Sequence, residues 1–191
     1  MAKWHGYGRC KSRLSKDIGF ASSSKIQEYM TMHTVAIAKY LESQNLIETT
    51  LAISGIGPKK SAQWSHELGI KNFALQGRGS LGERMRRQIL IARRNDFPHE
   101  KRNVIVIGTD LPDLCHMDLV SAIAKLKTHD LVLGPANDGG YWLIAFSHKL
   151  YSSELFLPFT NIDWSKERVL QNTIDNVISK KIKIGYLNKK I

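Results

Sequence analysis

Residues 103–113 read Asn-Val-Ile-Val-Ile-Gly-Thr-Asp-Leu-Pro-Asp, and this stretch decides the fold. Residues 103–108 are typical of a strand that is buried on both faces, as in a parallel sheet. Asp110 then follows the carboxyl end of that strand, where open α/β sheets bind their ligands. An aspartate there can hold Mg²⁺ or Mn²⁺, which bridge substrate phosphates. The structural alternatives are a turn at Asp110 and a helix cap at Asp113.

Strands and helices alternate on both sides of this segment. The apolar periodicity predicts strands at residues 49–54, 72–76, 103–108, 130–133, 139–146 and 183–187. It predicts helices at residues 22–43, 59–68, about 80–95, 117–127 and 165–179. This alternation indicates an α/β fold with a mostly parallel sheet in one domain, residues 1–191.

Local signals give more detail for three of the expected helices. The helix at 22–43 should bury a face made of Ile26, Tyr29, Met30, Ile37, Tyr40 and Leu41. Its N-cap candidates are Ser22, Ser23 and Ser24. Gly69 should end the second helix, while Ser80 and Glu83 fit a capping box at the start of the third. Ser165 is the expected cap of the last helix.

Composition excludes several classes of protein. The chain carries 28 Lys+Arg against 17 Asp+Glu, a net charge of +11, and most of the surplus lies before residue 103. A basic half could bind nucleic acid or attract a phosphorylated small molecule, but no nucleic-acid-binding motif accompanies it, so we expect no nucleic-acid partner. No apolar run is long enough for a membrane span. With only Cys10 and Cys115, we expect a reduced, cytoplasmic protein.

Residues 8–13 are the first candidate for binding a ligand. Gly8 lets the backbone approach a phosphate, and Arg9, Lys11 and Arg13 supply charged donors. The segment matches neither the Walker nor the Rossmann glycine pattern. Its structural alternative is an exposed basic arm. Such a loop normally follows a full first strand, of which Met1-Ala-Lys can be only the tail.

Two further glycine-containing segments are candidates. Asp138 follows the strand expected at 130–133, so it should reach the same rim as Asp110 and complete a metal–diphosphate site; a plain Asp-Gly hairpin turn is the alternative. The turn at 77–82 opens a helix, whose free N–H groups favour an anion or a base edge. A simple capped turn is the alternative there.

Five segments, taken in order, resemble one family. They read GRCKSRLS (8–15), QGRGSLGERM (76–85), VIVIGTDLPDL (104–114), LVLGPANDGGYWLIA (131–145) and NIDWSKERVLQNT (161–173). This combination is similar to a bacterial family of small GT-A-like proteins, domain of unknown function 2064. The family is related to nucleotide-diphospho-sugar transferases and is named as glycosyltransferases mostly for its fold.

The resemblance implies a three-layer Rossmann-like fold and a role for each candidate residue. Nucleotide phosphates would be held by Arg9, Lys11 and Arg13, and the base or ribose would lie near Gly77, Gly82 and Arg84. Asp110 would stand where GT-A enzymes place a metal-binding aspartate, with Asp138 as the second carboxylate. The implied activity is glycosyl transfer from a nucleotide-activated sugar with Mg²⁺ or Mn²⁺. The alternatives are a nucleotidyltransferase and a catalytically silent nucleotide-binding module.

This sequence also departs from the family pattern. Family members commonly have Asp where Ser80 stands. They begin with a full apolar strand before the glycine loop and extend past the position of Ile191. We therefore expect a truncated first strand and a chain clipped at both ends.

Overall fold

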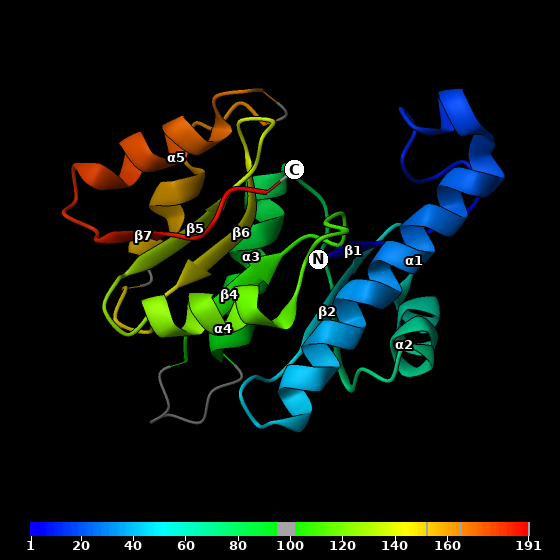
Figure 1. Ribbon diagram of the computed structural model, residues 1–191, viewed down its shortest axis with the longest axis horizontal. Coiled ribbons are helices and arrows are strands. Elements are labelled where there is room, and N and C mark those ends of the chain that lie inside the picture. Colours follow the sequence, from blue (N-terminus) through cyan, green and yellow to red (C-terminus); the bar gives the residue numbers. More distant parts are fainter. Residues whose placement is uncertain (95–101, 152, 165, 191) are drawn as a thin grey trace. The chain divides into compact units, whose positions relative to one another are not determined.

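The computed structural model describes residues 1–94, 102–151, 153–164 and 166–190 (Figure 1). These residues divide into two units. The first unit comprises Met1–Gly77 with Gly108–His116, and the second comprises Arg78–Ile107 with Met117–Ile191.

A parallel sheet forms the centre of the first unit. Its strand order is β1-β2-β3, and the strands are β1 (Ala2–Lys3), β2 (Thr50–Ser54) and β3 (Asn72–Leu75). Ala2 pairs with Ile53, and Leu51 pairs with Phe73. β1 lies beside β2 in Figure 1. The two strands expected at 49–54 and 72–76 are confirmed, and because all three strands are parallel, their carboxyl ends share one edge.

Two helices belong to this sheet, α1 (Ser15–Ser43) and α2 (Pro58–Glu67). α1 begins seven residues before the expected start, so the cap at residues 22–24 is wrong; Gly19, with φ 80°, interrupts its first turns. α2 starts with proline in its first turn, where the missing N–H costs nothing. Gly69 follows α2 with φ +69°, which confirms the expected stop.

The buried face of α1 differs from the predicted one. Tyr29 and Tyr40 are 66% and 52% exposed, whereas the buried positions are Ser15, Ser23, Gln27, Thr31, Thr34, Val35, Ala38 and Leu41. Gln27 and Thr31 can be buried because they bond to one another, with Gln27 Nε2 3.3 Å from Thr31 Oγ1. Apolar periodicity misses such a face because small and hydrogen-bonded polar residues fill half of it.

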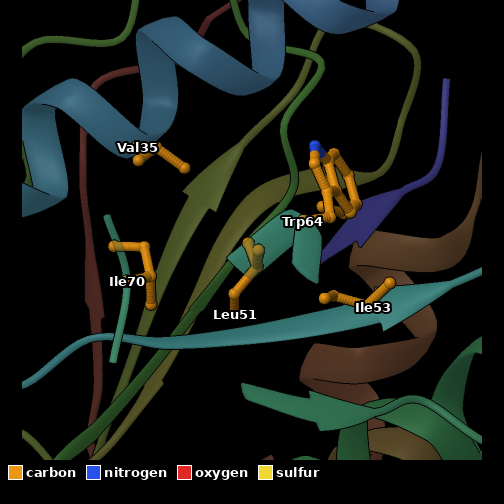
Figure 2. Packing of buried hydrophobic residues seen from close by; sticks show 6 residues of the cluster. Val35, Leu51, Ile53, Trp64 and Ile70 are labelled. Atoms are coloured by element: carbon orange, nitrogen blue, oxygen red, sulfur yellow. The ribbon is translucent and has the colours of Figure 1, made fainter. Parts of the chain in front are cut away.

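The core of the first unit lies on one face of this sheet. Leu51 and Ile53, two residues apart on β2, point to the same side. Figure 2 shows Val35 of α1 and Trp64 of α2 packed on them, with Ile70 beside them. Trp64 is only 4% exposed, so its ring is fixed by the core.

The second unit contains a mixed sheet with strand order β4-β6-β5-β7. The strands are β4 (Val104–Ile107), β5 (Leu131–Pro135), β6 (Tyr141–Phe146) and β7 (Ile184–Tyr186). β6 runs antiparallel to β4 and β5, so the expectation of a parallel arrangement fails at this strand. The physical reason is the short link between β5 and β6, which allows only a hairpin. β4 and β5 run in the same direction.

The apolar segment that decides the fold is less buried than predicted. In β4 only Val106 is buried, because β4 is the terminal strand of its sheet. The centre of the core is built instead from β5 and β6, where Leu131, Val132, Leu133, Leu143, Ile144, Ala145 and Phe146 are 0–1% exposed.

The helices of this sheet are α3 (Leu81–Arg94), α4 (His116–Lys125) and α5 (Val169–Ile178). All three agree with expectation within a few residues, although Ser165, the expected cap, lies outside the described residues. A 3₁₀ helix, η1 (Glu154–Phe159), was not predicted. It is only six residues long and contains Pro158, so its sequence has no α-helical periodicity.

Candidate nucleotide-phosphate site

The loop that follows β1 is folded against α1. Arg9 N donates to Gly6 O at 2.9 Å, and Cys10 is buried with its Sγ 3.9 Å from Ser24 Oγ. Gly8 and Lys11 both adopt positive φ, 69° and 45°. A positive φ is uncommon for a residue with a side chain, and it marks a tight turn at Lys11. Arg9 and Arg13 are exposed, so the loop presents its charges to solvent.

The structure brings Lys11 and Asp110 together. Lys11 Nζ donates to Asp110 Oδ1 at 2.8 Å, although 99 residues separate them in the chain. The Asp110 side chain is 67% exposed and that of Lys11 is 17% exposed. An exposed ion pair contributes only about 0–1 kcal/mol. The pair can therefore rearrange around an incoming charged ligand at little cost.

Residues 108–116 lie along α1, which positions Asp110. Gln27 Nε2 donates to Thr109 Oγ1 at 3.2 Å, directly before Asp110. Further along the helix, the His33 ring nitrogen Nε2 lies 3.0 Å from Leu114 O. Gln27 was not predicted as a buried residue of this site. The one sequence signal was its spacing of four residues from Ser23 and Thr31, which places the three polar side chains on one face of α1.

We predict that Thr109→Val destabilises the protein by about 1–2 kcal/mol. Thr109 is 5% exposed, and the change keeps its shape while removing the oxygen that accepts the Gln27 amide proton. Urea denaturation measures the free energy of unfolding. Thr50→Val on the exposed end of β2 serves as the control and should stay within about 0.5 kcal/mol of wild type. Equal stability of the two variants would remove Thr109 as an anchor.

Gly77 lies at the same sheet edge as the β1 loop. The preceding Gln76 is 3% exposed, and its Nε2 donates to Ala2 O at 3.0 Å and to Ala52 O at 2.9 Å. This amide therefore ties the carboxyl ends of the three parallel strands together. Gly77 itself has φ +74°. Gln76 was not predicted as a structural residue, because a glutamine ending an apolar strand has no distinctive pattern.

Gly82 and Arg84 belong to the second unit. The capping box is confirmed, since Glu83 Oε2 accepts from Ser80 N at 2.7 Å and from Ser80 Oγ at 2.9 Å. These bonds hold the pKa of Glu83 below its usual range. A Cβ at Gly82 would come within 2.6 Å of the Trp164 ring, so packing explains this glycine. A place for Gly82 and Arg84 near a base stays a prediction.

Asp138 lies in the hairpin between β5 and β6, in the second unit. Its Oδ1 accepts the Gly140 N–H at 2.9 Å, and Ala136 N donates to Gly140 O at 3.0 Å. The structure thus contains the hairpin turn that was the alternative for this segment. One carboxylate oxygen supports the turn, and the role of Asp138 as a second metal ligand stays a prediction.

The surroundings of Asp110 fit a metal ion that is held partly by the protein and partly by the substrate. Across residues 1–94, 102–151, 153–164 and 166–190, no three His, Cys, Asp or Glu side chains gather closely enough to enclose a metal ion. Mg²⁺, however, is usually held by one or two carboxylates, water and substrate phosphates. The exposed Asp110 carboxylate fits that mode, in which the phosphate supplies part of the coordination.

No helix in the described part of the chain is long and apolar enough to cross a membrane. Within the described residues, Cys10 and Cys115 do not form a disulfide.

Comparison with known proteins identifies the fold and then the family. A crystal structure described as "putative nucleotide-diphospho-sugar transferase from Desulfovibrio desulfuricans G20" superposes with a TM-score of 0.79 at 22% identity, covering 100% of this chain and 79% of that one. This chain therefore shares the fold of that protein. Residues 37–166 match the family described as "Uncharacterized protein conserved in bacteria (DUF2064)", and the chain belongs to this family. Among proteins with curated descriptions, none matches. These findings confirm the resemblance and the fold class expected from sequence.

Proposed function

We propose that this protein is a glycosyltransferase that takes a sugar from a nucleoside-diphosphate donor. The observation that supports the proposal most strongly is the Lys11–Asp110 pair, with Nζ and Oδ1 2.8 Å apart. It joins a basic, glycine-containing loop to a carboxylate that follows a strand in a transferase fold. A diphosphate needs both features, because it is anionic itself and is commonly bound with a divalent cation.

The residues of the loop would act on the departing diphosphate. Negative charge develops there as the glycosidic bond of the donor breaks, and positioned cations stabilise that charge in the transition state. Arg9, Lys11 and Arg13 supply these cations, and Gly8 permits close approach of the backbone. Mg²⁺ or Mn²⁺ held by Asp110 and the diphosphate would withdraw further charge. Gly77, at the same sheet edge, would lie on the side of the base or ribose.

Asp138, Gly82 and Arg84 carry the roles that the family resemblance implies. Asp138 is proposed as the second carboxylate for the metal, and Gly82 and Arg84 as residues on the nucleotide's base side. They belong to the second unit, so their parts rest on the resemblance alone.

The reaction class is tested by the leaving group. The protein is incubated with Mn²⁺ and a panel of nucleoside-diphosphate sugars, and release of nucleoside diphosphate is measured. In parallel, pyrophosphate release is measured with each nucleoside triphosphate and phosphorylated sugars. We expect release only from a diphospho-sugar. Pyrophosphate release would identify a nucleotidyltransferase instead, and nucleotide binding with no turnover would identify a silent module.

A further inference from the structure

A cleft of about 220 Å³ opens between α1 and α2 in the first unit. Trp4 and His5, which follow β1, form part of its wall. Helix residues complete the lining, among them Glu28 and Met32 of α1 and Trp64 and Glu67 of α2. None of these residues is among those proposed to bind the nucleotide or the metal. The cleft is thus a separate feature of the molecule.

Three aromatic rings meet in this cleft: Trp64 lies edge-on to Trp4 and His5, at 90° and 63°, and the His5 ring is tilted by 34° from that of Trp4. The Trp4 and Trp64 rings lie 5.0 Å apart at 90°, and the His5 ring lies 4.3 Å from Trp4 and 5.7 Å from Trp64. Trp64 is held by the core, as Figure 2 shows. Trp4 packs on the same core, and a Cβ at Gly6 would come within 2.9 Å of its ring. The aromatic walls are therefore in place before any ligand arrives.

Two carboxylates give the cleft a negative charge within the basic half of the chain. Glu28 Oε1 lies 3.7 Å from His5 Nε2, and its side chain is 46% exposed. Glu67 Oε1 accepts from the Gln63 amide at 2.9 Å, a neutral partner. His5 Nδ1 is buried and makes no hydrogen bond to any described residue. The carboxylates would repel an anionic ligand.

Among the described residues, no Lys or Arg side chain makes a cation–π contact with the rings of this cleft. Two cation–π contacts occur among the described residues, Arg86 over Phe156 and Lys190 over Trp142, and neither ring lines the cleft. Aromatic faces attract cations electrostatically, most strongly when water is excluded. We propose that the cleft binds a small organic cation, an alkylammonium group of the size of choline. The aromatic walls would contact its methyl groups, while Glu28 and Glu67 supply the opposite charge.

The proposal is tested with choline and its neutral isostere, 3,3-dimethylbutan-1-ol. Each is titrated into the ¹⁵N-labelled protein, and the indole N–H resonances of Trp4 and Trp64 report binding. Because the two probes have the same shape, their difference in affinity measures how much the positive charge of choline contributes to binding. We expect choline to bind at least about tenfold more tightly. Equal affinities, or no shift with choline, would overturn the proposal.

Variants locate the binding to this cleft without removing a core residue. Glu28→Gln and Glu67→Gln should each weaken choline binding about three- to tenfold while the melting temperature stays near that of wild type. Glu42→Gln is the matched control on α1, where Oε1 accepts the Thr49 N–H at 2.9 Å, and it should bind choline as wild type does. Unchanged binding in both cleft variants would place the cation elsewhere and overturn the assignment.

Discussion

Asp110→Asn is expected to lower the rate of sugar transfer by at least about 100-fold in a protein that stays folded. The amide is nearly isosteric with the carboxylate but is a poor ligand for a hard divalent cation. It also removes the negative partner of Lys11, 2.8 Å away. Stability should change little, because an exposed ion pair contributes about 0–1 kcal/mol. Initial rates with whichever diphospho-sugar the donor panel identifies, together with thermal melts, measure both effects.

The control for this variant is Asp175→Asn in the second unit. Asp175 Oδ1 accepts from Gln171 Nε2 on the surface of α5, so this change alters the net charge equally. Its rate should match that of wild type. A rate for Asp110→Asn within a few-fold of wild type would remove Asp110 from the active site.

Gly139→Ala is expected to destabilise the protein by about 3 kcal/mol or more. Gly139 has φ +84°, and a Cβ there would overlap the backbone carbonyl of Glu167. The strain of a left-handed alanine and the displacement of packed backbone each cost about 1–3 kcal/mol. The displacement would also break the 2.9 Å bond from Leu170 N to Gly139 O. The melting temperature should fall by roughly 6–12 °C, as about 2–4 °C per kcal/mol is usual at this size.

The neighbouring Gly140→Ala gives a matched comparison. Its φ is not positive, and the nearest atom to an added Cβ is Asp138 Oδ1 at 3.2 Å, the end of a side chain that can move. We expect a clearly smaller loss of stability for this variant in urea denaturation. If the free energy of unfolding falls equally in both variants, the collision with Glu167 is not the reason why residue 139 must be glycine.

The elements of this fold were predictable where their signals are local. The Ser80–Glu83 capping box and the Gly69 stop depend on a few adjacent residues, and both occur as expected. The direction of β6 depends instead on the short link at Asp138, which allows only a hairpin, and the parallel prediction failed because no helix separates β5 from β6. The buried face of α1 was not predicted, because hydrogen bonds allow the polar side chain of Gln27 to be buried. The hydrophobicity pattern of a sequence does not reveal such bonds.

The candidate site was predictable as a set of residue types but not as a set of contacts. The rule that ligands bind at the carboxyl ends of strands pointed to Asp110, and the basic glycine loop pointed to Lys11. Their direct contact across 99 residues could not be read from either segment. The same holds for Gln76, whose amide bonds to Ala2 and Ala52 exist only once three strands are paired.

Calorimetric titration with nucleoside diphosphates and their sugar derivatives in Mn²⁺ tests most directly whether Lys11 and Asp110 form a diphosphate site. We predict saturable binding of at least one of them to the wild-type protein. Lys11→Gln should weaken it at least about tenfold, which corresponds to the loss of one charge-assisted hydrogen bond. Lys60→Gln, at an exposed position of α2, is the control and should bind as wild type does. Binding that is unchanged in Lys11→Gln, or no binding of any of these nucleotides by the folded wild-type protein, would contradict this account.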